Sequence, residues 1–347
     1  MHIPDHYISE PVAGATAVAA LAGLTLVGYY HTRRQKSHAV PTARNDRVRL
    51  ASHDFFNADS RSAAPMKGPE RMSRTIFLAA LVFVAQMMNF PLADNFSGHL
   101  IGATLLVYLC GAFPAMVIMA CVLTVQCLLF GDGGLFALGA NILNMALIAS
   151  VPMVLFQRGS AHPIVARLFQ TRFGRVLLIT VSAILSVQMA AVACALELAL
   201  SGSWSASAGL GALLASHLPV ALLEVLISVA VILLLEAYSQ PASNPLMNRR
   251  AEGWVSAMML IALLVLAVLF SSDLPDALEI VLHQLSATAV YTSHALEYHA
   301  PFADYQWTLI SGWFASTLLV GLLGTVLTGF GATLLLKSLE RFAIDRK

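Results

Sequence analysis

Residues 209–236 read GLGALLASHLPVALLEVLISVAVILLLE and contain no Lys or Arg. A helix needs about 20 consecutive apolar residues to cross the hydrocarbon core of a bilayer. This stretch is long enough, and its two interior ionisable side chains, His217 and Glu224, are seven residues apart and therefore lie on one face of a helix. The sequence predicts a membrane-spanning helix here, with polar groups that are costly inside a bilayer.

The same apolar character extends over the whole chain of 347 residues. Hydrophobic residues make up 58% and charged residues 11%, compared with about 45–50% and roughly 25% in soluble domains. This composition excludes an ordinary soluble enzyme, and a net charge of +1 provides no basic surface for nucleic acid. We predict an all-α polytopic membrane protein with about nine transmembrane helices, seven in a first unit and two in a second. The predicted spans are 12–30, 75–93, 100–112, 114–130, 134–156, 175–201, 209–236, 253–271 and 308–336. The third and fourth are short and are separated by a predicted break at Phe113-Pro114.

Positive charge predicts the orientation of these spans, because cytoplasmic loops are rich in Lys and Arg. If the N-terminus is outside, all 20 Lys and Arg residues fall on the cytoplasmic side. The outer segment 272–306, by contrast, carries acidic residues and no basic one. We therefore predict an N-out, C-in protein of the bacterial cytoplasmic membrane. The segments 31–74 and 237–252 are predicted to be cytoplasmic linkers.

The start of the chain, Met1-His2-Ile3-Pro4-Asp5, is polar and leads directly into a span. It lacks the basic start and the cleavage site of a signal peptide, so Met1 is expected to stay on the protein. A free amine followed by His2 offers three nitrogens in chelate geometry: the amine, the His2 amide and the His2 imidazole. Such nitrogen sets suit Ni²⁺ and Cu²⁺, and Co²⁺ accepts related ones. The simpler interpretation, a solvated His2, stays open.

His99 is a candidate fourth ligand, at the mouth of the third predicted span. It stands between Gly98 and Gly102, and these small residues would let another backbone approach closely. If the N-terminus folds inward, His99 completes a square of nitrogens. The alternative is that His99 only bonds a backbone carbonyl, as many histidines at helix ends do.

The opening MHIPDHYISEPV and the block from Asn89 to Asn144, with SGHL, QCLLFGDGG and ALGAN, resemble the CbiM/NikM family. Members of this family are substrate-binding (S) components of energy-coupling factor (ECF) transporters for cobalt and nickel. The resemblance implies that Met1, His2 and His99 hold the metal. It also implies partner subunits, namely an ATPase and a transmembrane coupling (T) subunit. The chain departs from the family pattern at His6, which is either a competing ligand or, more simply, a solvated neighbour, and at Phe96, which puts the metal preference in question.

The last third resembles a second component, the two-helix PDGLE module of the CbiN/NikN type. Ser-Ser-Asp-Leu-Pro-Asp-Ala-Leu-Glu at 271–279 carries this likeness, with Ala277 in place of the motif's Gly. The expected units are therefore 1–236 for the metal-binding component and 253–347 for a fused accessory module. Three histidines of the outer loop could pass metal to the main site, although a hydrated loop is the simpler interpretation. They are His283, His294 and His299.

Other polar residues in the apolar stretches have structural and functional interpretations. Asn141 could make interhelical hydrogen bonds or support the His99 loop from outside the ligand set. His217 and Glu224 could serve in coupling or translocation, since ionisable groups within a membrane are costly. Asp132-Gly133-Gly134 is interpreted as a turn.

The predicted function is uptake of Ni²⁺ or Co²⁺, with the metal as transported substrate and no resident cofactor. The chain has no GxxxxGK(S/T) phosphate loop, so ATP hydrolysis is assigned to a partner subunit. Two alternatives remain: a membrane metal sensor or scaffold without transport, and a membrane metalloenzyme. The second is weakened because no HExxH spacing is present.

Overall fold

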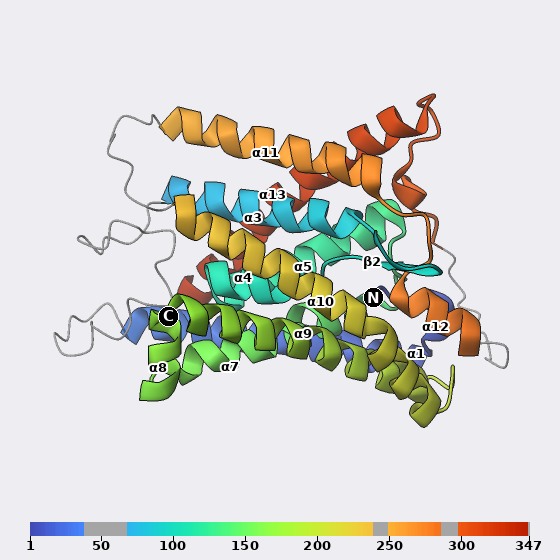
Figure 1. Cartoon of the computed structure of the whole chain (residues 1–347), viewed down its shortest axis with the longest axis horizontal. Helices are drawn as coiled ribbons and strands as arrows, with labels where there is room; N and C mark the ends of the chain where they lie inside the picture. Colours follow the sequence, from blue (N-terminus) through green and yellow to red (C-terminus); the bar gives the residue numbers. More distant parts are fainter. Residues whose placement is uncertain (38–67, 239–248, 286–297, 346–347) are drawn as a thin grey trace.

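The computed structural model describes residues 1–37, 68–238, 249–285 and 298–345. Its long helices lie side by side along the longest axis of the molecule (Figure 1). The prediction of an all-α polytopic membrane protein is confirmed, because six helices are long and apolar enough to cross a membrane. The main helices are α1 (Glu10–Ser37), α3 (Gly68–Met87), α4 (Ala103–Cys110), α5 (Ala112–Val125), α7 (Val151–Gly159), α8 (Pro163–Gln170), α9 (Arg172–Leu200), α10 (Ala206–Tyr238), α11 (Arg249–Phe270), α12 (Ala277–Leu285) and α13 (Trp313–Asp345).

Six of the nine predicted spans reach full length within the described residues. Two more, Met72–Met87 in α3 and Ala257–Phe270 in α11, are shorter apolar helices. The full-length spans are Glu10–Arg33, Ala112–Phe130, Leu138–Gly159, Arg172–Leu200, Ser207–Leu235 and Trp313–Leu339.

The predicted span at 100–112 is corrected by the structure. It forms only the eight-residue helix α4, which at 1.5 Å per residue is about 12 Å long and cannot cross a hydrocarbon core of about 30 Å. The chain breaks at Gly111, which has a φ of 81°, and not at Pro114. Pro114 lies instead in the first turn of α5, where a missing backbone N–H costs no helical hydrogen bond.

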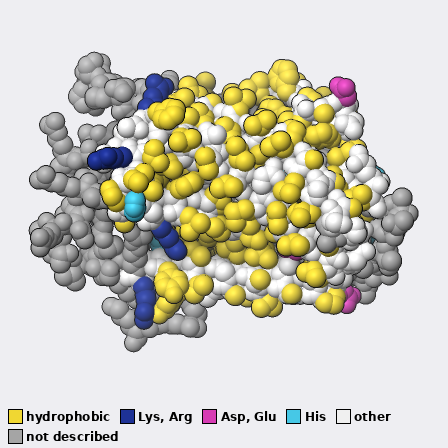
Figure 2. All heavy atoms as spheres, turned by 60° about the horizontal axis from the view of Figure 1, so that its bottom comes forward, with side chains coloured by type: hydrophobic (Ala, Val, Ile, Leu, Met, Phe, Trp, Pro, Cys, Tyr) yellow, Lys and Arg dark blue, Asp and Glu magenta, His cyan; other side chains and the backbone are white. Residues whose placement is uncertain are grey.

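The surface separates apolar and charged side chains along the helix direction. Figure 2 shows hydrophobic side chains over the middle of the visible face, Lys and Arg at one end, and Asp and Glu at the other. Many large apolar side chains of the long helices are exposed, including Leu196 and Leu200 on α9 and Leu222 and Leu226 on α10. A belt of this kind is what a lipid environment requires.

A β-hairpin and the short helix α12 lie toward the end of the molecule at which the N-terminus lies (Figure 1). A hairpin of β1 (Phe90–Ala93) and β2 (Phe96–Gly98) precedes α4. Helix α5 continues as the π-helix η2 (Gln126–Phe130), and α6 (Leu138–Asn141) continues as the π-helix η3 (Ile142–Leu147) and the 3-10 turn η4 (Ile148–Ser150). π-helical turns occur frequently at functional sites. The short elements also include the 3-10 turns η1 (Asp5–Tyr7) and η6 (Ala303–Tyr305).

The C-terminal helices pack directly on the earlier ones. α13 contacts α3 and α5, α11 contacts α3, and α12 contacts α10. The most extensive helix–helix contact among the described residues is between α9 and α10. The predicted division into 1–236 and 253–347 stays a prediction, and in the described residues the second segment is an integral part of the helix assembly.

The contact between α1 and α6 generates a stability prediction. A Cβ on Gly139 would lie 2.5 Å from the Ala17 Cα, so Gly139→Ala must push two helices apart. We expect it to destabilise the protein by about 1–3 kcal/mol, measured as a lower midpoint of thermal unfolding in detergent. The control is Gly14→Ala on α1, where a Cβ meets nothing within 4 Å. An unchanged midpoint for Gly139→Ala would contradict the close packing.

Candidate metal centre

The first three residues of the chain are buried inside the helix assembly. Met1 is 4% exposed, His2 7% and Ile3 0%. The Met1 amine lies 3.0 Å from His99 Nε2 and 3.1 Å from Asp276 Oδ2. A buried amine and two imidazoles therefore meet at one point, and the predicted residues Met1, His2 and His99 are brought together.

The loop at 131–137 holds this N-terminal segment in place. The Gly134 N–H donates to the Ile3 carbonyl at 2.9 Å, and Asn141 Oδ1 accepts from the Ile3 N–H at 2.9 Å. Gly134 is required here, because a Cβ at this position would overlap the backbone and carboxylate of Asp5. Asn141 thus supports the N-terminal segment, which differs from its expected place beside the His99 loop.

Asp5 fixes the segment from its other end. Its carboxylate accepts hydrogen bonds from the backbone N–H groups of Leu135, Phe136 and Ala137, at 2.9, 2.7 and 3.1 Å. These amides precede α6, and a carboxylate is favoured at such a helix start. The Pro-Asp at positions 4 and 5 therefore works as an anchor for the residues before it.

His99 is positioned by two membrane helices. Glu224 of α10 accepts from the N–H groups of Ile101 and Gly102, at 2.9 and 3.0 Å. From α3, the Gln86 amide donates to the Ile101 carbonyl at 2.8 Å. One peptide group two residues after His99 is thus held from both sides. Gly102 has a φ of 84°, a conformation that glycine adopts without strain.

Burial keeps His99 uncharged. Desolvation, followed by repulsion from the nearby Met1 amine, lowers the pKa of His99 to about 3. Its ring is therefore neutral at physiological pH, which is the form that can bind a metal ion.

His2 stacks on His99 and is held by a carboxylate. The ring centroids are 5.1 Å apart with an interplanar angle of 13°. His2 Nδ1 lies 2.7 Å from Asp132 Oδ1, while its buried Nε2 has no hydrogen-bond partner within the described part of the chain. Asp132 also accepts from the Tyr305 hydroxyl at 2.9 Å. Burial alone would raise the pKa of Asp132, but the adjacent His2 holds it well below its usual range.

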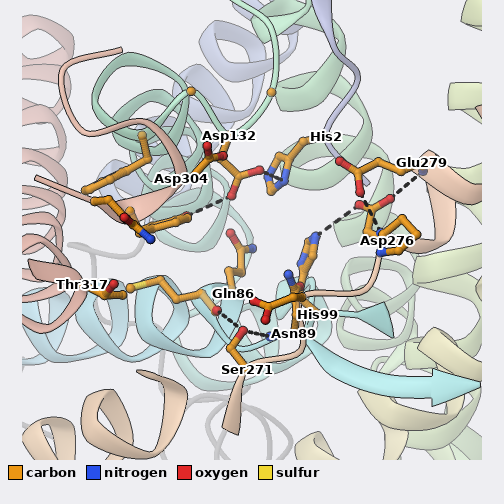
Figure 3. Close-up of a pocket in the computed structure, with 18 of the residues that line it drawn as sticks. His2, Gln86, Asn89, His99, Asp132, Ser271, Asp276, Glu279, Asp304 and Thr317 are labelled. Carbon is orange, nitrogen blue, oxygen red and sulfur yellow. Dashed lines mark hydrogen bonds and ion pairs between the residues drawn. The ribbon is translucent and has the colours of Figure 1, made fainter. Parts of the chain in front are cut away.

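These groups line an open cavity of about 1340 Å³. Figure 3 shows His2, His99, Gln86 and the Asp132 and Asp276 carboxylates around the same space. Among the described residues, those that line the cavity include no Lys or Arg, and six of them are acidic. The acidic ones are Asp5, Asp132, Asp273, Asp276, Glu279 and Asp304.

Of the remaining predicted residues, only some line the cavity. His217 is buried in α10 and bonds the Leu213 carbonyl of its own helix through Nδ1 at 2.9 Å. His283 and His299 are exposed and do not line the cavity. His294 falls outside the described residues. The exposed His6 of η1 lines the cavity.

Three contributors were not predicted, and each joins distant parts of the chain. Asp132 is more than the turn residue it was interpreted to be, because it holds His2. Tyr305 carries no local sequence signal for contact with Asp132. Asp276 has a local signal for a helix start, since Asp-x-x-Glu stands before an apolar run. Its contact with the Met1 amine across 275 residues is beyond any local pattern.

Within the described residues, no group of three or more His, Cys, Asp or Glu side chains is arranged to hold a metal ion. The fold and the site define a class: a polytopic membrane protein with a buried, nitrogen-rich site fed by an acidic cavity.

Comparisons with known proteins identify the family. The model of the CbiM family, described as the cobalt uptake substrate-specific transmembrane region, matches residues 61–242. The chain belongs to this family and is a cobalt/nickel transport component.

Individual relatives extend the match beyond the family region. A protein of Archaeoglobus fulgidus named as a fused nickel transport protein (NikMN) is 26% identical over 345 residues, covering 96% of this chain and 100% of the relative. One of Lactiplantibacillus plantarum named as a fused nickel transport protein (LarMN) is 33% identical, over 58% of this chain and 49% of its own length. The crystal structure of a truncated transition metal transporter has 25% identity and a TM-score of 0.48, covering 69% of this chain and 99% of that one.

The anchor at Asp5 can be tested without any metal. Asp5→Ala leaves three amides without their acceptor, so we expect the N-terminal segment to lose about 2 kcal/mol of local stability. Hydrogen exchange of the peptide covering residues 1–9 should then speed up by roughly 30-fold. The control is Asp94→Ala, which removes an exposed carboxylate between β1 and β2 and should leave exchange unchanged. Equal exchange in both variants would remove Asp5 as the anchor.

Proposed function

We propose that this chain is the substrate-binding component of an ECF-type importer for Ni²⁺ or Co²⁺, in the bacterial cytoplasmic membrane. The observation that carries the proposal is the Met1 amine 3.0 Å from His99 Nε2, with the His2 ring stacked on His99. The relatives named as nickel transport proteins agree with this substrate class.

The proposed ligands are the Met1 amine, the His2 amide and imidazole, and His99. Four nitrogens suit Ni²⁺ and are accepted by Co²⁺, whereas Mg²⁺ and Ca²⁺ require oxygen ligands. Bonding of both the His2 amide and its ring to one ion closes a six-membered ring only through Nδ1. Because Nδ1 faces Asp132 in this structure, the His2 ring turns on metal binding. Nε2 is then able to face Asp132, which is the carboxylate–histidine–metal arrangement common at metal sites.

Energy and translocation are assigned to partners. An ATPase and a T subunit would drive the component between outward-facing and inward-facing orientations, and the metal would leave on the cytoplasmic side. Metal binding displaces protons from the ligand nitrogens, so ordering of the site and binding are coupled. A sensor or scaffold would bind metal equally well, and uptake by cells that also express the partner subunits separates it from an importer.

The chelate is tested by adding two Ala residues before Met1. This insertion keeps every side chain but moves His2 to position four, so the amine and the His2 ring no longer belong to one amino-terminal chelate. We expect the affinity for Ni²⁺, measured by isothermal titration calorimetry on the purified protein, to fall by more than roughly 100-fold, beyond the effect of losing an outer partner. His99→Ala should lower it as well.

The matched control is His283→Ala, which removes an exposed histidine of the C-terminal segment. It should leave the affinity unchanged. Unaltered binding after the Ala insertion would overturn the N-terminal site, and loss of binding in His283→Ala would instead point to the outer histidines.

A further inference from the structure

Two side chains from the C-terminal segment reach the groups proposed to hold the metal. Asp276 precedes α12, and its Oδ2 lies 3.1 Å from the Met1 amine and 4.0 Å from His99 Nε2. Tyr305 ends η6 and donates its hydroxyl to Asp132, the carboxylate that holds His2. Asp276 therefore lies beside Met1 and His99. Tyr305 is linked to His2 through Asp132.

Asp276 is held in place by hydrogen bonds with Leu278 and Glu279 in the first turn of α12. Its Oδ1 accepts from the N–H groups of Leu278 and Glu279, and its own N–H donates to Glu279 Oε2. This is a reciprocal helix-start arrangement. Oδ1 is thus used by the helix, which leaves Oδ2 for the amine.

The segment before Asp276 is joined to the hairpin that carries His99. Ser97 donates through its N–H to the Pro275 carbonyl at 2.8 Å and through its hydroxyl to the Leu274 carbonyl at 2.7 Å. The Ser272 N–H donates to the Asn89 carbonyl at 2.8 Å. Asp276 and His99 therefore belong to one hydrogen-bonded unit, although they come from opposite halves of the chain.

Tyr305 is held just as firmly. Its ring stacks on Phe130 with centroids 4.5 Å apart, and the Phe302 N–H donates to the Leu129 carbonyl at 2.9 Å. Asp304 and Tyr305 both have positive φ, 54° and 57°, a strained conformation for residues other than glycine that collects at functional sites. Tyr305 is therefore fixed through its ring and its backbone at the place where its hydroxyl bonds Asp132.

We propose that Asp276 and Tyr305 are positioning residues of the metal centre, so that the C-terminal segment is a structural part of the binding site. Asp276 holds the Met1 amine beside His99, and its negative charge lies next to the incoming cation. Tyr305 orients the Asp132 carboxylate that holds the His2 ring. This inference rests on the proposed function.

The first test compares Asp276→Asn with Asp273→Asn in the full-length protein. Asn caps a helix start as well as Asp does, so Asp276→Asn keeps α12 and removes only the charged contact with the amine. Asp273 lines the same cavity, and its substitution removes the same charge. We expect Asp276→Asn to weaken Ni²⁺ binding by roughly 10- to 100-fold, as loss of an outer partner does, and Asp273→Asn to leave it nearly unchanged.

A second readout requires no metal. Hydrogen exchange of the peptide covering residues 1–9 should speed up in Asp276→Asn and stay unchanged in Asp273→Asn. Equal effects of the two variants on affinity would mean that the cavity charge acts as a whole, and would overturn the positioning role of Asp276.

The second test compares Tyr305→Phe with Tyr298→Phe. Tyr298 donates its hydroxyl to the Leu128 carbonyl. Like Tyr305, it joins the segment 298–305 to the segment 126–132, but at a point away from His2. Tyr305→Phe should weaken Ni²⁺ binding by roughly 10-fold, whereas Tyr298→Phe should not change it. Equal affinities in the two variants would overturn the role of Tyr305.

The two hypotheses fail in different ways. Failure of the unaltered protein to bind Ni²⁺ or Co²⁺ overturns the proposed function. Tight binding that depends on His99 but is the same in Asp276→Asn, Tyr305→Phe and their controls overturns only the inference about the C-terminal segment.

Discussion

The structure depends on the burial of the chain's first amine. A polar group of this kind is costly to remove from water unless it is paired, and the Met1 nitrogen is paired with His99 and Asp276. Because the amine exists at one end of the chain only, its burial fixes the position of His2 and Ile3 as well. The Asp5 anchor, the Asn141 bonds and the absence of a Cβ at Gly134 all serve to keep these residues in place.

The same site explains why polar residues lie inside the membrane helices. Glu224 and Gln86 lie on different helices, and both bond the peptide of Ile101. A buried carboxylate is acceptable when its oxygens receive hydrogen bonds, and Glu224 receives them from two backbone amides. A shift of α3 relative to α10 would therefore move the peptide that follows His99.

The sequence was sufficient for the long helices, since hydropathy and helix length together determine whether a segment crosses a bilayer. Met1 and His2 form a local two-residue pattern that the sequence displays, and the family resemblance joined His99 to them; the structure places the three together, and their binding of a metal stays a prediction. The sequence was not sufficient for Asp132, Tyr305 and Asp276, whose partners lie 130 or more positions away. The short α4 was missed because Gly111 stops a helix through its backbone conformation, a property that average hydropathy does not contain. His217 bonds a carbonyl of its own helix, and its role in coupling stays a prediction.

The two kinds of donor around the cavity have different physical effects. Carboxylates at the cavity wall attract any divalent cation, because the attraction depends on charge and distance and not on the identity of the ion. Nitrogen ligands discriminate, because hard ions such as Mg²⁺ and Ca²⁺ give up oxygen ligands only at great cost. The acidic wall and the nitrogen site occupy one cavity in this structure, so collection and selection of an ion would occur within a short distance. Asp276 stands at the boundary, with one oxygen beside the buried amine and its helix at the cavity wall. Met1, in the first third of the chain, and Asp276, in the last third, meet at this boundary. Encoding both in one polypeptide keeps the two sides of the boundary together.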